Sequence, residues 1–302
     1  MTYRAPVRDL AFTLQAVAGI DHVAATGAFP DYDAEVLGAV LEAAAQFSEG
    51  VLAPLNRIGD LKGSTWADGA VTAAPGFADA YRQFAEGGWT GLSAPAHAGG
   101  QQLPKALELA AYETVHAANM AFGLCPMLSL ATIEALESHG TDRQKDVYLT
   151  RLVSGEWTGA MVLTEPQAGS DLGALTATAV PNGDGTYALT GQKIFITWGD
   201  HDATDNIVHM VLARLPDAPP GPTGRSSRLR RTGDRRRRTR GPPSPSRCST
   251  SRPSGRRRGS AGPARPRRTA PPLPAQPRSD RRRSPGRRRL RPPCRAPPPR
   301  SG

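Results

Sequence analysis

A loop of small and polar residues, placed after an apolar stretch, is the first candidate for chemistry in this chain. The run MVLTEPQAGSDL occupies positions 161–172, and we call it the first block. Its apolar start ends in Thr164, and Glu165 and Pro166 favour a turn before the small-residue loop. Such a loop lets backbone donors approach a ligand closely. The first block is therefore a candidate ligand-binding loop.

The second block, TGQKIFITWG at 190–199, alternates in the way that a half-buried strand does. Ile194 and Ile196 would lie on one face of this strand, and Phe195 and Thr197 on the other. A flat redox ring binds where an apolar face can stack on it and a polar group can reach its heteroatom edge. An ordinary hairpin with a polar turn has the same pattern, so periodicity alone leaves both interpretations open.

Helices are predicted for the part of the chain before these blocks. The predicted spans are 33–50, 75–87, 104–116, 122–139, and a last helix that begins at 141–142 and runs through 152. Asp31 or Asp33 would cap the first of them. Phe77, Tyr81 and Phe84 recur at helical spacing, which indicates a core stripe rather than a cofactor site.

After Trp157 the pattern changes from helices to strands. The predicted strands are 159–164, 175–180, 187–198 and 207–215. The run NGDG at 182–185 predicts a hairpin between the second and the third strand. Both blocks would therefore lie in a β-region that follows a helical one.

Several ordered motifs, together with the two blocks, resemble the acyl-CoA dehydrogenase family. They are GGWTGLSAP at 87–95, GGQQLP at 99–104, HGTDRQK at 139–145 and LVSGEW at 152–157. The resemblance runs from the N-terminus to about Gly224. The leading MTYRAPVRD is similar to the extended branch that includes methylmercaptopropionyl-CoA dehydrogenases. Two positions depart from the family pattern, since Gln102 replaces a usual glycine and Ala98 a more often polar residue.

The resemblance and the composition together imply an α+β chain with an incomplete second domain. An N-terminal extension at 1–32 precedes an all-α N-terminal domain at 33–157. A partial, flavin-binding middle β-domain follows at 158–224, and an Arg/Pro-rich tail at 225–302.

The resemblance also implies FAD as the cofactor and α,β-dehydrogenation of an acyl-CoA thioester to a trans-2-enoyl-CoA as the reaction. The positions that match the family's flavin contacts are Met161, Leu163, Thr164, Gly169, Ser170, Phe195, Ile196 and Thr197. Ser170 also matches a residue that meets the CoA part of the substrate. The hydroxyl of Thr197 matches the group near the hydride-accepting nitrogen. Phe195 stands where tryptophan is common, so it keeps the stacking face and loses an N–H donor.

No catalytic residue is expected in this chain. In the family the base is a glutamate of a C-terminal domain that has no counterpart in this sequence, and Glu165 matches a position that is mainly architectural. The histidines show no metal-ligand spacing, and no metal is expected. An acyl-CoA substrate, an electron-transferring flavoprotein as electron acceptor and a homo-oligomeric state follow from the resemblance alone.

The charge of the chain divides it into two unlike pieces. Residues 1–224 hold 11 basic and 25 acidic residues, a net charge of −14, whereas residues 225–302 hold 27 Arg and 2 Asp, a net charge of +25. The second piece contains 16 prolines and no Lys, Glu, Ile, Val, Phe, Tyr, Trp or Met. Because nothing apolar could offset the entropy of ordering it, disorder is expected there.

Two interpretations of this tail compete. It is rich in Arg, Pro, Gly and Ala, which have GC-rich codons, and it lacks Lys, Ile, Phe, Tyr and Met, which do not. This composition favours an out-of-frame translation and a catalytically incomplete fragment. The alternative is a non-catalytic binding protein whose basic tail contacts nucleic acid or acidic partners without sequence preference. Neither a signal peptide nor a stretch of membrane-spanning length is expected, so the sequence favours a cytoplasmic protein without a membrane partner.

Overall fold

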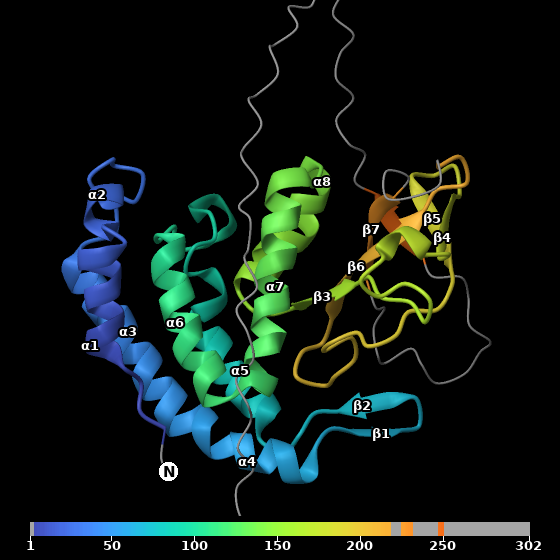
Figure 1. The fold of residues 1–302 in the computed structure, drawn as a ribbon. Helices are drawn as coiled ribbons and strands as arrows, with labels where there is room; N and C mark the ends of the chain where they lie inside the picture. Colours follow the sequence, from blue (N-terminus) through green and yellow to red (C-terminus); the bar gives the residue numbers. More distant parts are fainter. Residues whose placement is uncertain (1–2, 219–224, 232–246, 251–302) are drawn as a thin grey trace, which may run out of the picture. The chain divides into compact units, whose positions relative to one another are not determined.

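A computed structural model describes residues 3–218, 225–231 and 247–250, and the last two segments are described by their backbone alone. The chain begins with helices and continues with a sheet (Figure 1). This order confirms the predicted α+β fold class. The N-terminal extension at 1–32 carries two short helices.

The predicted helices have termini close to the predicted ones, with one exception, and three further helices within the first 62 residues were not predicted. The helices are α1 (Val7–Phe12), α2 (Ile20–Ala24), α3 (Ala34–Phe47), α4 (Ala53–Lys62), α5 (Phe77–Glu86), α6 (Lys105–Ala118), α7 (Met120–His139), α8 (Asp142–Gln144) and α9 (Thr150–Val153). The exception is the end predicted near Gly50, because a π-helical stretch, Ser48–Leu52, joins α3 to α4. Leu52 is fully buried, and the Ser48 hydroxyl lies 2.9 Å from that of Thr114 in α6. These tertiary contacts outweigh the helix-breaking tendency of one glycine.

Local signals for helix starts and for the core are confirmed. The Asp33 carboxylate accepts a hydrogen bond from the Val36 amide at 2.8 Å and caps α3. Thr141 and Gln144 form a reciprocal capping box at the start of α8. The stripe predicted on α5 is buried in the helical core, where Phe84 packs edge-on against Phe122 of α7 at a centroid distance of 5.8 Å.

The strands form one small hairpin and one larger sheet. The hairpin pairs β1 (Thr65–Ala67) with β2 (Ala70–Thr72), and the larger sheet contains β3 (Thr158–Val162), β4 (Thr178–Pro181), β5 (Thr186–Thr190), β6 (Ile207–Arg214), β7 (Arg225–Arg231) and β8 (Arg247–Thr250). Its order is β3-β6-β4-β5-β8-β7, and β7 also pairs with β6. The predicted β4–β5 hairpin is confirmed, whereas β3 runs parallel to β6.

The predicted strand over the second block is wrong. β5 ends at Thr190, and residues 191–199 follow an irregular path. Burial still alternates, since Ile194 and Ile196 are half-buried and Phe195 and Thr197 are exposed. The anchoring contacts described below replace strand pairing in this stretch.

Two short strands are described within the region from residue 225 onward. β7 pairs antiparallel with β6 from Arg225↔Arg214 to Arg231↔Val208, and β8 pairs with β5 and β7. Strand pairing uses backbone groups, so a composition poor in apolar side chains does not exclude it. Most of the region that we expect to be out of frame lies outside the described residues.

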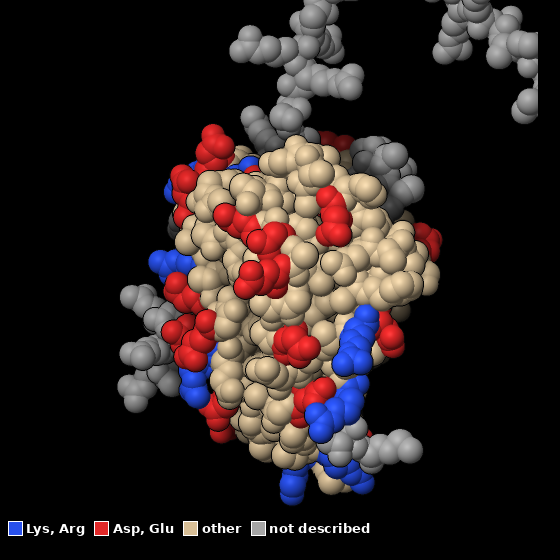
Figure 2. All heavy atoms as spheres, turned by 90° about the vertical axis from the view of Figure 1, so that its left-hand side faces the viewer, with Lys and Arg blue, Asp and Glu red and all other residues tan. Residues whose placement is uncertain are grey.

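Two helical stretches are long and apolar enough to cross a membrane by length and composition, contrary to the sequence-based expectation. They are Ala34–Lys62 and Met120–His139. Both pack into the helical core, where Leu41 and Phe122 are fully buried. Core packing therefore accounts for their apolar composition. Acidic side chains are spread over one face of the helical region, in line with the excess of Asp and Glu in residues 1–224 (Figure 2).

Candidate functional site

The two blocks lie side by side at the end of β3. The Ile194 amide donates a hydrogen bond to the Thr164 carbonyl oxygen at 3.1 Å. One residue earlier, Lys193 Nζ donates to the Leu163 carbonyl oxygen at 2.7 Å. The structure thus brings together two segments that are separated by the β4–β5 hairpin in the sequence.

Glu165 is the centre of this junction and is only 2% exposed. Its carboxylate accepts hydrogen bonds from Lys193 Nζ at 2.8 Å, from the Thr176 amide at 2.7 Å, from the Ala177 amide at 3.1 Å and from Gln167 Nε2 at 2.6 Å. Burial by itself would raise the pKa of this carboxyl. The hydrogen bonds from Lys193, Thr176 and Ala177 outweigh burial and lower the pKa to about 2. Glu165 is therefore an ionised structural group whose lone pairs are occupied, which is unsuited to a catalytic base.

The predicted contact residues surround an exposed surface at this junction. Phe195 is 88% exposed, although it is a large apolar ring, and its backbone has a φ of +54°. Gly169, Ser170 and Thr197 are exposed as well, whereas Met161, Leu163 and Thr164 are half-buried. An exposed aromatic ring, an exposed hydroxyl two residues later and a small-residue loop in the paired block are the features that a flat ring with a polar edge requires.

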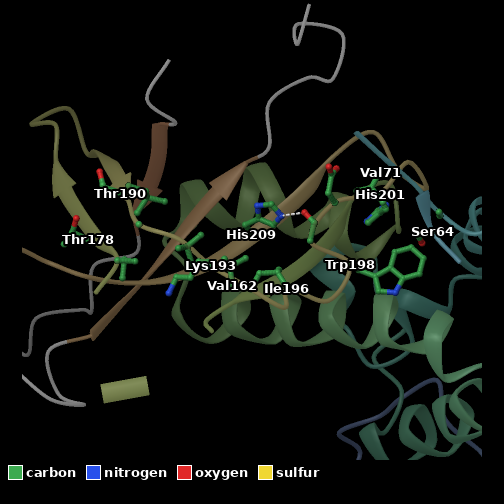
Figure 3. Close-up of a pocket in the computed structure, with 18 residues that line it drawn as sticks. Ser64, Val71, Val162, Thr178, Thr190, Lys193, Ile196, Trp198, His201 and His209 are labelled. Atoms are coloured by element: carbon green, nitrogen blue, oxygen red, sulfur yellow. Dashed lines mark hydrogen bonds between the residues drawn. The ribbon is translucent and has the colours of Figure 1, made fainter. Parts of the chain in front are cut away.

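A pocket of about 810 Å³ lies on the other side of the second block (Figure 3). Its walls come from the sheet, from the β1–β2 hairpin and from residues 191–201. Of the eight predicted contact residues, Ile196 lines this pocket and the other seven do not. Val162 of the first block, which was not predicted as a contact, lines it as well. Figure 3 shows Lys193, Ile196 and Trp198 in chain order along this pocket. The predicted site is therefore divided, with Ile196 facing the pocket and the exposed residues belonging to the outer surface.

Sequence reasoning missed two residues that hold the second block in place. Lys193 anchors its start, as described above. Near its end, Trp198 Nε1 donates a hydrogen bond to the Ala121 carbonyl oxygen at 2.9 Å, and Gly199 accepts one from His209 Nε2 at 2.8 Å. The sequence did contain a signal for Lys193, because it is the one lysine in a stretch of alternating apolar residues. A buried lysine requires hydrogen-bond acceptors, so a partner for it could have been expected. Nothing local marks the partners of Trp198, because they are distant in sequence.

Comparison with known proteins agrees with the motif-based assignment. The model of the acyl-CoA dehydrogenase N-terminal domain matches residues 38–156, and that of the acyl-CoA dehydrogenase middle domain matches residues 160–229. The 3-methylmercaptopropionyl-CoA dehydrogenase of Ruegeria pomeroyi is 48% identical over 226 residues, which cover 75% of this chain and 38% of that protein.

Solved structures show the same relationship. The butyryl-CoA dehydrogenase of Megasphaera elsdenii is 26% identical with a TM-score of 0.56, and the match covers 67% of this chain and 50% of that one. The structure of PigA with FAD and proline is 25% identical with a TM-score of 0.53, covering 67% of this chain and 49% of that one. The chain thus spans about two fifths of the length of its curated relative and about half of these structures. The two domain matches lie in the order of the helical region and the sheet, and the chain belongs to the acyl-CoA dehydrogenase family.

Proposed function

We propose that the surface at the junction of the two blocks binds the flavin ring of FAD in an acyl-CoA dehydrogenase. The observation that carries this proposal is the direct pairing of the two blocks. The Ile194 amide donates a hydrogen bond to the Thr164 carbonyl oxygen, and the ring of the next residue, Phe195, is exposed. Because the ring is large, apolar and unburied, it is available for stacking. The FAD in the related PigA structure and the family of the chain support the same assignment.

The contacts divide by chemistry. Met161, Leu163 and Phe195 supply apolar surface to the ring, and Ile196 supports the second block from the pocket side. In this proposal the hydroxyls of Thr164 and Thr197 form hydrogen bonds with the polar edge of the ring, and the loop at Gly169 allows a close backbone approach. The proposed flavin contacts are Met161, Leu163, Thr164, Gly169, Ser170, Phe195, Ile196 and Thr197.

The proposed reaction is the conversion of an acyl-CoA thioester to a trans-2-enoyl-CoA. When bound, FAD accepts the β-hydrogen with its electron pair, while a base takes the α-proton. Ser170, exposed in the first block, would contact the CoA part of the substrate. Glu165 cannot be the base, because its carboxylate is buried and held ionised by Lys193 and backbone amides. We propose that the base lies outside residues 3–218.

Titration of the purified 302-residue chain with FAD tests this proposal. Flavin fluorescence and absorbance should report saturable binding. Phe195→Ala should weaken the affinity by roughly tenfold, because aromatic stacking contributes about 1–3 kcal/mol. Thr197→Val should weaken it by a smaller factor, since it removes one hydrogen bond. Leu61→Ala, at an exposed apolar residue of α4, is the matched control and should bind FAD normally. A wild-type chain that shows no saturable binding would refute the proposal.

The proposed partners follow from the family. They are an acyl-CoA substrate, an electron-transferring flavoprotein as acceptor, and further copies of the same chain in a homo-oligomer, with the cytoplasm as the proposed location. Anaerobic addition of an acyl-CoA to the FAD-loaded chain tests the incomplete-fragment interpretation. Because the base lies outside residues 3–218 and residues 225–302 contain no Glu, the absorbance of oxidised flavin should stay unchanged. A fall in this absorbance on addition of a thioester with an α,β single bond would show that the chain holds its own base.

A second candidate function rests on the charge asymmetry. With +25 on residues 225–302 and −14 on residues 1–224, the chain could act as a non-catalytic protein that binds nucleic acid or acidic partners through its tail. This alternative predicts that polyanion binding, and not flavin binding, is the property of the purified chain. Measuring both on one preparation separates the two functions.

A further inference from the structure

Trp198 connects the second block to two helices of the N-terminal region. Its Nε1 donates to the carbonyl oxygen of Ala121, in the first turn of α7, at 2.9 Å. Its ring stacks on Phe77, the first residue of α5, with a centroid distance of 6.3 Å and an interplanar angle of 21°. The same ring meets His201 edge-on at 5.0 Å. Trp198 therefore has directional contacts on both its nitrogen and its faces.

The backbone is in an uncommon conformation at this anchor and three residues before it. Phe195 and Trp198 have φ angles of +54° and +49°, in the left-handed region. This conformation costs an L-residue about 1–2 kcal/mol, and it persists where surrounding contacts determine it. Lys193 and Ile194 fix the start of the stretch to the first block. Trp198 fixes its end, so the exposed residues 195–197 lie between two anchors.

We propose that Trp198 is a positioning residue for the flavin-binding surface. By holding the end of the second block against α5 and α7, it keeps the Phe195 ring and the Thr197 hydroxyl in a fixed place. Without it, residues 195–198 would relax toward a negative φ, and the Phe195 ring would turn away from its present direction. This inference rests on the proposed flavin-binding function. It assigns to Trp198 an effect on flavin geometry that an ordinary core residue would not have.

FAD binding to variants of the full 302-residue chain tests the role of Trp198. Trp198→Phe keeps a ring on Phe77 and loses the bond to Ala121, whereas Trp198→Ala loses both. We expect FAD affinity to fall about threefold in the first variant and about tenfold in the second, in line with one hydrogen bond and one aromatic contact. The visible circular dichroism of the bound flavin should shift in the same order. Trp66→Ala, in the exposed β1–β2 hairpin, is the control and should match the wild type.

Hydrogen exchange of the flavin-free chain gives a second, independent readout. The Gly199 amide donates to the Ile196 carbonyl oxygen at 3.0 Å, and its exchange reports the turn at the end of the second block. We expect at least tenfold faster exchange there in Trp198→Ala, with the β4–β5 hairpin unchanged. Retained cooperative unfolding in both variants would show that the fold is intact.

The outcomes separate the two proposals. If the wild-type chain binds no FAD, the flavin function fails and the flavin role of Trp198 fails with it, and exchange at Gly199 still decides whether Trp198 fixes the segment. If the wild type binds FAD and Trp198→Ala binds it with the same affinity and the same circular dichroism, the positioning role is wrong and the flavin site stands. Unchanged exchange at Gly199 would likewise overturn the role of Trp198 as an anchor.

Discussion

At the scale of single residues, the junction of the two blocks depends on a buried ion pair. Lys193 Nζ lies 2.8 Å from Glu165 Oε1, and their side chains are 11% and 1% exposed. Buried charges are tolerated only where hydrogen bonds replace water, and here Thr176 and Ala177 amides supply them. The Glu165 carboxylate, which the resemblance assigns a mainly architectural position, is thus one that the fold requires in its charged form.

This charge predicts a specific acid sensitivity. The pKa of Glu165 is about 2 in the folded chain and ordinarily 4.5, so the unfolded chain binds more protons between these values. The stabilisation is fully present above about pH 4.5 and is lost as the pH falls toward 2, an effect of about 3 kcal/mol. Urea denaturation from pH 7 to pH 3 should show this component in the wild type and not in Glu165→Gln.

At neutral pH the same variant should be less stable by about 3–5 kcal/mol, because Lys193 keeps a buried charge without a carboxylate. Asp60→Asn removes a carboxylate from the exposed pair with Arg57 and should cost less than about 1 kcal/mol. Equal losses in the two variants would contradict the structural role assigned to Glu165.

We expect that a glycine at position 195 suits the stability of the fold, whereas a phenylalanine there suits FAD binding. A φ of +54° suits glycine, and the ring is 88% exposed, so Phe195→Gly removes strain and little burial. We expect the free energy of unfolding to stay equal or rise by up to about 1 kcal/mol, while FAD affinity falls. Phe12→Gly is the matched control, because Phe12 is 64% exposed but has a helical φ of −58° and should lose about 1 kcal/mol. A clear loss of stability in Phe195→Gly would contradict this account.

At the scale of elements, the sequence correctly predicted those features of the helices that depend on residues close together in the chain. The Asp33 cap and the α5 stripe were found because capping and helical periodicity act within a few residues. The end of α3 and the path of the second block were predicted wrongly, because distant partners decide them: Thr114 for the first, and Ala121 for the second. The pairing of the two blocks was expected only through the resemblance, since periodicity does not reveal which segments meet.

The contact of β3 with α7 also depends on residues that are distant in sequence, because Gly159 of β3 packs against Thr132 of α7. A Cβ at Gly159 would lie 2.3 Å from Thr132 Oγ1 and 2.6 Å from Thr132 Cβ. The Gly159 amide donates to the Ser129 hydroxyl on the same helix at 3.0 Å, so the strand cannot move away freely. Gly159→Ala should destabilise the chain by about 1–3 kcal/mol in urea denaturation.

The control for this prediction is a glycine with free space. A Cβ at Gly38 in α3 would meet nothing within 4 Å, and alanine is the better helix former. Gly38→Ala should therefore raise the stability by up to about 1 kcal/mol. Changes of the same sign in both variants would show that close approach is not what requires glycine at position 159.

At the scale of the whole molecule, two opposite charges are combined in one polypeptide. The proposed flavin surface belongs to the acidic part, since both blocks lie within residues 161–199, whereas the positive charge lies in residues 225–302. β7 and β8 pair with β6 and β5, so removing the entire basic region would also remove strands of the sheet. A cut after Thr250 avoids this problem.

A chain that ends at residue 250 loses 17 Arg and 1 Asp, which changes the net charge from +11 to −5. The full chain should bind duplex DNA of arbitrary sequence, and the logarithm of its affinity should fall linearly with the logarithm of salt concentration, by about 0.9 per phosphate neutralised. The shortened chain should lose this binding and keep the affinity for FAD, because counterion release depends on the arginines and flavin stacking does not. Titrations of both chains at several salt concentrations measure this difference. DNA binding that survives the deletion would place the polyanion site in residues 1–250, and FAD binding lost with the deletion would make the basic region part of the flavin site.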